Sequence, residues 1–91
     1  MSPLASLTSL KWLYLCGNQI SNISPLQNLT SLIELSITDN QISDIQPLVD
    51  NVGLGQGDTV DLRNNPLDAT SVNTYIPQLE LRGVTVLYTA P

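Results

Sequence analysis

Aliphatic residues recur along the first half of the chain in a pattern that repeats at a fixed interval. Segment 4–25 can be laid over segment 26–47, and the aliphatic positions, Asn18 with Asn40, and Pro25 with Pro47 all coincide. A unit this short cannot bury its own apolar side, so the repetition predicts a stacked array of coils.

The spacing changes character within each repeat. Leu13-Tyr14-Leu15 and Leu35-Ser36-Ile37 alternate apolar and polar residues, which predicts short half-buried strands. Before each strand, leucines recur every third residue, at 4, 7 and 10 and again at 26, 29 and 32. That spacing favours a 3₁₀-like return segment over a long α-helix.

The third unit is irregular. Segment 60–67 matches segment 35–42, but it begins three positions later than the interval between the first two repeats requires. The three extra residues fall in the glycine-rich stretch 50–58, where glycine permits a flexible bend. A surface insertion is the simpler interpretation, because a phosphate-binding loop needs a lysine and a following helix.

A different pattern begins at Asp68. Asp68 or Thr70 is a candidate cap for a helix over 71–82, and Gly83 is its expected stop. Pro77 removes one internal hydrogen bond, which predicts a kink or an interruption. Segment 84–86 then alternates like a last strand. Helix and strand together predict a unit that covers one end of the stack.

The pattern L-x-x-L-x-L-x-x-N-x-[IL], present at 10–20 and 32–42, resembles the signature of the leucine-rich repeat family. The 22-residue period and the trailing Ile-x-Pro at 23–25 and 45–47 are similar to the short repeats of bacterial internalins. The resemblance implies an α/β solenoid, a right-handed superhelix. Its short parallel sheet would line the concave side, its convex side would be 3₁₀ or irregular, and a helix plus strand would cap the C-terminal end. We divide the single domain 1–91 into repeats 4–25 and 26–47, an irregular unit 48–67 and a cap 68–91.

Three asparagines follow the predicted strands at the same offset: Asn18, Asn40 and Asn65. In the family's pattern this residue turns inward and its amide pairs with backbone groups of neighbouring turns, which would otherwise be buried without partners. We therefore expect a structural asparagine ladder without a functional role.

The binding candidates are the strand residues between the aliphatic ones, because they must point out of the concave sheet. They are Trp12, Tyr14, Cys16, Glu34, Ser36, Thr38, Thr59, Asp61, Arg63 and Thr85, with Leu87 as a further candidate.

Trp12 and Tyr14 stand out, since exposed aromatic residues often anchor protein interfaces. The alternative is that they only cover an end of the stack or pack on Lys11. Glu34, Asp39 and Asp61 form either an acidic docking patch or an ordinary solubilising surface.

The charge balance argues against several function classes. Eight acidic residues against Lys11, Arg63 and Arg82 give a net charge of −5, which disfavours nucleic acid and anionic membranes. No apolar run approaches the ~20 residues of a membrane span, so we expect no membrane insertion.

The chain also lacks the residue sets of catalysis. It contains no histidine and one cysteine, so Cys16 has no histidine base to activate it. Asp58 and Asp61 lack the spacing of a calcium loop. We expect no enzymatic activity, cofactor or metal.

Two functions remain open. The first is a protein-interaction module whose concave face binds a protein or peptide. The second is a scaffold fragment of a longer repeat protein, which self-associates, for example as a homodimer, through an uncovered leucine-rich N-terminal end formed by Leu4, Leu7, Leu10, Leu13 and Leu15. The first residues lack the features of a secretion signal. The compartment is therefore undetermined: secreted or cell-surface if the chain comes from an internalin-like protein, cytoplasmic otherwise.

Overall fold

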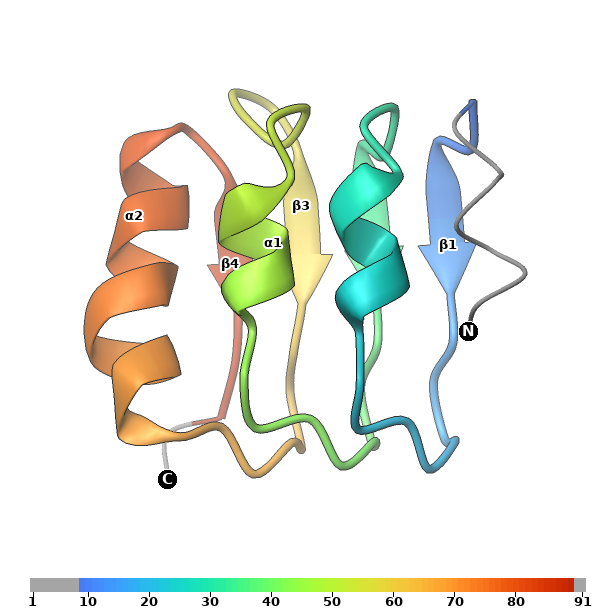
Figure 1. The fold of residues 1–91 in the computed structure, drawn as a ribbon, viewed down its shortest axis with the longest axis vertical. Coiled ribbons are helices and arrows are strands. Elements are labelled where there is room, and N and C mark those ends of the chain that lie inside the picture. Colours follow the sequence, from blue (N-terminus) through green and yellow to red (C-terminus); the bar gives the residue numbers. More distant parts are fainter. Residues whose placement is uncertain (1–8, 90–91) are drawn as a thin grey trace.

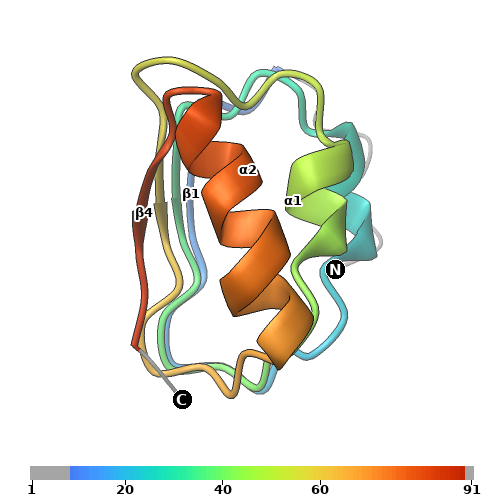
Figure 2. The same ribbon diagram turned by 90° about the vertical axis from the view of Figure 1, so that its left-hand side faces the viewer.

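The computed structural model describes residues 9–89. Its strands β1 (Trp12–Tyr14), β2 (Glu34–Ser36), β3 (Thr59–Asp61) and β4 (Thr85–Leu87) form one parallel sheet in the order β1-β2-β3-β4 (Figure 1). One face of this sheet is covered by the helical segments (Figure 2). They are η2 (Ser24–Asn28), α1 (Gln46–Asp50), η3 (Ser71–Tyr75) and α2 (Ile76–Leu81). Each coil therefore contributes one strand and one return segment, and the prediction of a leucine-rich repeat fold is confirmed.

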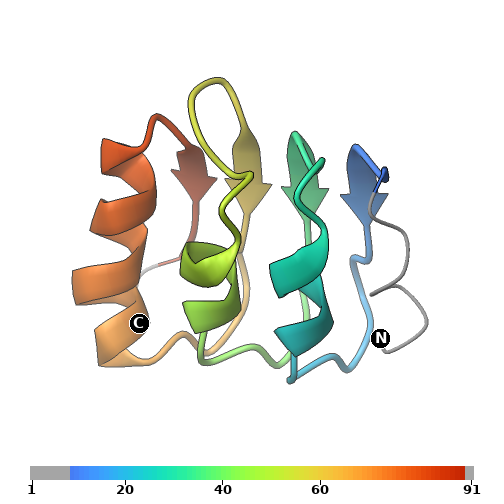
Figure 3. The same ribbon diagram turned by 45° about the horizontal axis from the view of Figure 1, so that its top comes forward.

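The strand register follows the sequence repeat. Leu13 lies opposite Leu35, Leu35 opposite Val60, and Val60 opposite Val86. The row of strands stands behind a row of return segments in Figure 3. The pairing of Leu35 with Val60 is thus the one that the matching segments predicted, whereas β4 begins one residue later than expected.

The return segments before β2 and β3 differ in kind. η2 is a 3₁₀ helix and α1 a short α-helix, each with proline in its first turn, where the fixed φ angle of proline suits a helix start. The predicted return segment before β1 includes Leu4 and Leu7, which lie outside the described residues.

The core lies between the sheet and the return segments. It is almost entirely aliphatic, and its members come from equivalent positions of successive coils: Leu13, Ile23, Leu26, Leu29, Leu32, Leu35, Ile37, Ile42, Ile45, Leu48, Leu54, Val60, Leu62, Leu67, Ile76, Leu79, Val84 and Val86. The stacking of coils therefore buries what a single repeat would expose.

The three extra residues of the third unit lie in a loop of 55–58, after Leu54. Leu54 occupies the place of Leu32, since each amide donates to the carbonyl three residues earlier. Instead of a free surface loop, the segment is bonded to the C-terminal cap: the Gly57 amide donates to Gly83, and the Thr85 amide donates to Asp58. The segment expected to be a flexible bend is therefore held to the cap by backbone hydrogen bonds.

The cap helix accommodates Pro77 through a π-helical turn. The Ile76 amide at the end of η3 donates to the Ser71 carbonyl, five residues earlier, and Pro77 then stands in the first turn of α2, where a missing amide costs little. The expected interruption is confirmed in this form. Asp68 supplies the start, because its carboxylate accepts a hydrogen bond from the Ser71 amide at 2.8 Å.

Candidate functional site

The face of the sheet that points away from the return segments carries the sequence-predicted binding residues. We call it the sheet face. One row across the four strands is Trp12, Glu34, Thr59 and Thr85, and the next is Tyr14, Ser36, Asp61 and Leu87. Cys16, Thr38 and Arg63 continue the face just beyond the strands, and all eleven are exposed or half-buried. Strand alternation places them there, because the residues between them point into the core.

Apolar side chains lie at the two edges of the sheet face. Trp12 and Tyr14 on β1 are 55% and 57% exposed, and Leu87 on β4 is 41% exposed. The central strands carry hydroxyl and charged groups. Large aromatic side chains with more than half their surface in water leave apolar area available to a partner.

Glu34 interacts with Tyr14 across the first two strands. Hydrogen bonding to the Glu34 carboxylate raises the pKa of the Tyr14 phenol, and partial burial and the negative charge of Glu34 add smaller upward shifts. A carboxylate next to the hydroxyl favours the protonated phenol. The neighbouring carboxylate therefore keeps the Tyr14 phenol in its neutral form.

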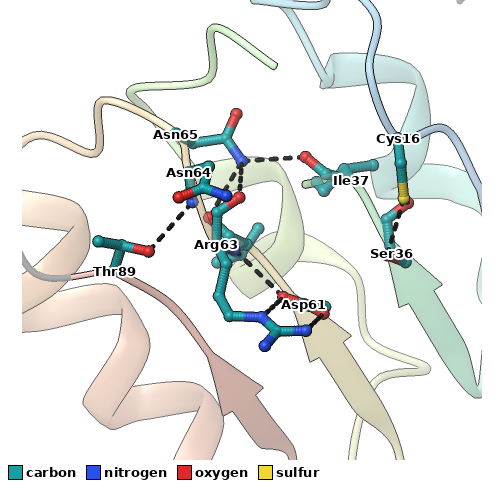
Figure 4. A network of polar contacts seen from close by, with 9 residues as sticks. Cys16, Ser36, Ile37, Asp61, Arg63, Asn64, Asn65 and Thr89 are labelled. Carbon is teal, nitrogen blue, oxygen red and sulfur yellow. Dashed lines mark hydrogen bonds and ion pairs between the residues drawn. The ribbon is translucent and has the colours of Figure 1, made fainter. Parts of the chain in front are cut away.

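Asp61 and Arg63 form an ion pair at the end of β3 (Figure 4). The Arg63 guanidinium donates from Nε to one carboxylate oxygen of Asp61 and from Nη2 to the other, at 3.0 and 2.8 Å. The hydrogen bond from Arg63 lowers the pKa of Asp61. The predicted acidic patch is therefore partly neutralised: Asp61 is paired, and Asp39 lies beyond β2 in a turn with φ of 58°.

The Cys16 thiol lies 3.1 Å from the Ser36 hydroxyl (Figure 4). Hydrogen bonds from Ser36 and then Thr38 stabilise the thiolate and lower the pKa of Cys16. Cys16 is an exposed free thiol. No cluster of three or more potential metal ligands occurs within residues 9–89.

The asparagine ladder has two complete members. Asn40 donates to Leu15 of the preceding coil at 2.9 Å and accepts from the Ile20 amide. Asn65 repeats these contacts with Ile37 and Ile42.

Asn18 makes the own-turn contacts of the ladder. It is exposed, and its described hydrogen bonds reach only Leu15 and Cys16 of its own turn. Its described partners all come from its own coil, so pairing with a neighbouring turn stays a prediction for Asn18.

Three buried or half-buried polar residues have structural roles that were not predicted from the sequence. Asn51 donates to the carbonyls of Leu26 and Leu29. The Ser71 hydroxyl accepts from the Ile45 amide and donates to the Ser43 carbonyl. Asn51 stands at a position that is leucine in the two preceding repeats. A polar residue at this core position could have indicated its buried role.

Arg82 has no comparable signal in the sequence. Its guanidinium donates to the carbonyls of Val49, Asn51 and Leu54, and so ties α1 and the loop after it to the cap. Arg82 and the two buried residues have structural roles, away from the sheet face.

Known protein families and solved structures that are similar to this chain have the same architecture. Residues 8–50 match the family described as Leucine Rich repeats (2 copies). No curated protein matches the chain in sequence.

Two solved structures of Listeria monocytogenes proteins are similar to the whole chain. One is an internalin (inlF), with 33% sequence identity and a TM-score of 0.75 over 100% of this chain and 26% of that one. The other is an internalin C2 (inlC2), with 31% identity and a TM-score of 0.66 over 98% of this chain and 46% of that one. The chain thus spans about a quarter and just under half of these two proteins.

No helix in the described part of the chain is long and apolar enough to cross a membrane.

Proposed function

This chain is a leucine-rich repeat protein, and we propose that it binds a protein or peptide through its sheet face. Leucine-rich repeats generally form binding modules without enzymatic activity, and their stacked strands present a broad surface to a partner.

The exposed aromatic pair on β1 is the observation that supports this proposal most. Trp12 and Tyr14 project from adjacent outward positions of one strand, and each has more than half of its surface in water. Tryptophan and tyrosine are enriched among the residues that dominate binding energies. The remaining sheet-face residues, with hydroxyl, carboxylate and guanidinium groups, supply polar contacts around them.

A peptide selection tests the proposal while the natural partner is still unidentified. A random-peptide display library is selected on the folded protein, and enriched peptides are synthesised and titrated against the protein. Replacing both Trp12 and Tyr14 by alanine should weaken binding at least about tenfold. The matched control replaces Val52 and Leu81, which are 85% and 90% exposed off the sheet face, and should leave the affinity unchanged.

Two results would contradict the proposal. One is the absence of any peptide enriched above background. The other is binding that survives in the aromatic double variant but is lost in the control variant. Circular dichroism of both variants shows whether each keeps its fold.

Self-association is the second candidate function, and one observation favours it. Leu10, Leu15 and Ile20 of the first coil are half-buried, whereas their equivalents Leu32, Ile37 and Ile42 are at most 1% exposed. A second copy packed along β1 would cover them. Light scattering across a concentration series should then give the mass of a dimer, and a monomer at every concentration would exclude this candidate.

A further inference from the structure

Trp12, Tyr14 and Glu34 form one cluster at the corner of the sheet face, which we call the aromatic–carboxylate cluster. Trp12 and Glu34 are register partners on adjacent strands, whose backbones run ~4.8 Å apart. Tyr14 occupies the next outward position of β1, diagonal to Glu34, and the nearby Glu34 carboxylate raises the pKa of its phenol. The carboxylate therefore lies beside both exposed aromatic rings.

Glu34 has no ion-pair partner within residues 9–89. The only ion pair there joins Arg63 and Asp61, and the Arg82 guanidinium is bound to backbone carbonyls of α1 and the following loop. Lys11, the remaining cation, makes no ion pair in the same part of the chain. The cluster thus presents a negative charge without a counter-ion, in a protein whose net charge is −5.

The chemistry of the cluster fits a flat cation. A guanidinium stacks on an aromatic face through cation–π attraction, and its forked N–H groups pair with a carboxylate in two parallel hydrogen bonds. A carboxylate has about four lone-pair sites, so Glu34 can accept both N–H groups of the fork.

From this geometry we propose that the aromatic–carboxylate cluster binds an arginine side chain of the partner; the inference rests on the proposed protein-binding function. The guanidinium lies against the exposed rings and pairs with Glu34. A purely apolar partner is disfavoured, because it would desolvate the Glu34 carboxylate without replacing its hydrogen bonds. Lysine supplies the charge but neither the planar stacking surface nor the fork.

The peptide selection described above also tests the arginine. We expect the enriched peptides to share an arginine, and replacing it by citrulline, which has nearly the same shape without the charge, should weaken binding about tenfold. Glu34→Gln in the protein should cause a similar loss. The matched control is Glu80→Gln, which removes one negative charge from α2 on the opposite side of the molecule and should leave the affinity unchanged.

The outcomes separate this inference from the proposed function. Peptides that need Trp12 and Tyr14, yet bind equally well with citrulline or to the Glu34→Gln protein, would overturn the arginine site and leave protein binding standing. Equal loss in the Glu34→Gln and Glu80→Gln proteins would reduce the effect to net charge and also overturn it. No enriched peptide at all would count against both proposals.

Discussion

Replacing Asn65 by alanine should destabilise the protein far more than the same replacement at Asn18. The two residues follow their strands at equivalent positions, but within residues 9–89 only Asn65 of the two bonds to a neighbouring coil. Its amide donates to the Ile37 carbonyl at 2.9 Å, and its oxygen accepts from the Ile42 amide at 3.1 Å. Alanine would leave the buried Ile42 amide without a partner, and the Ile37 carbonyl would keep only its hydrogen bond from Asn40.

The magnitude follows from these hydrogen bonds. Asn65 gives up two contacts between coils and its contacts with Leu62 and Arg63 of its own turn; a hydrogen bond is worth about 0.5–1.5 kcal/mol, and an unsatisfied buried group costs about 1–3 kcal/mol. We expect Asn65→Ala to lower the free energy of unfolding by about 2–4 kcal/mol. Asn18→Ala should cost less than about 1 kcal/mol, because water can replace its two exposed contacts.

Urea unfolding followed by far-ultraviolet circular dichroism measures both variants against the parent protein, with linear extrapolation to water. A similar m-value in the three proteins keeps the comparison within two-state behaviour. Equal losses of stability in the two variants, or a loss of less than about 1 kcal/mol for Asn65→Ala, would contradict the structural role of Asn65.

Three further predictions concern close contacts and charge. Gly53→Ala should cost more than about 2 kcal/mol in urea unfolding, because the new Cβ would lie 1.9 Å from a backbone oxygen of the preceding coil; Gly55→Ala, with its nearest atom at 3.7 Å, should be tolerated, and equal costs would contradict this. Arg82→Met should lower the stability by about 2–4 kcal/mol, against at most about 1 kcal/mol for Arg63→Met, whose side chain is 57% exposed; the reverse order would show that Arg82 does not fasten the cap. Arg63→Ala should raise the pKa of Asp61 back toward 3.8, measured by an NMR pH titration; since the pKa is lowered in the folded protein, the pair stabilises it above about pH 4 and this contribution is lost as the pH falls through the lowered pKa, so an unchanged pKa would contradict the assignment.

The repeating part of the fold could be predicted because its determinants are local. Alternation around Leu13 and Leu35 sets which strand residues face the core, and the equal spacing of the repeats sets the register. For the same reason, the residues of the sheet face follow from the sequence alone. Their role in binding stays a prediction.

Contacts between distant segments could not be predicted in this way. Nothing near Arg82 in the sequence indicates that its guanidinium reaches carbonyls of α1 and the loop after it, or that the loop of 55–58 is bonded to the cap. The ion pair of Asp61 with Arg63, which leaves Glu34 as the sheet-face carboxylate without a counter-ion in the described part, likewise depends on side-chain geometry.

The periodic aliphatic residues thus specify the coil, because a short unit can bury its apolar side only against an equivalent neighbour. Contacts between distant segments fix how the cap is fastened to the stack and which charged side chains are paired. These hydrogen bonds and ion pairs depend on which buried carbonyls and which opposite charges come close together, and folding alone brings them together.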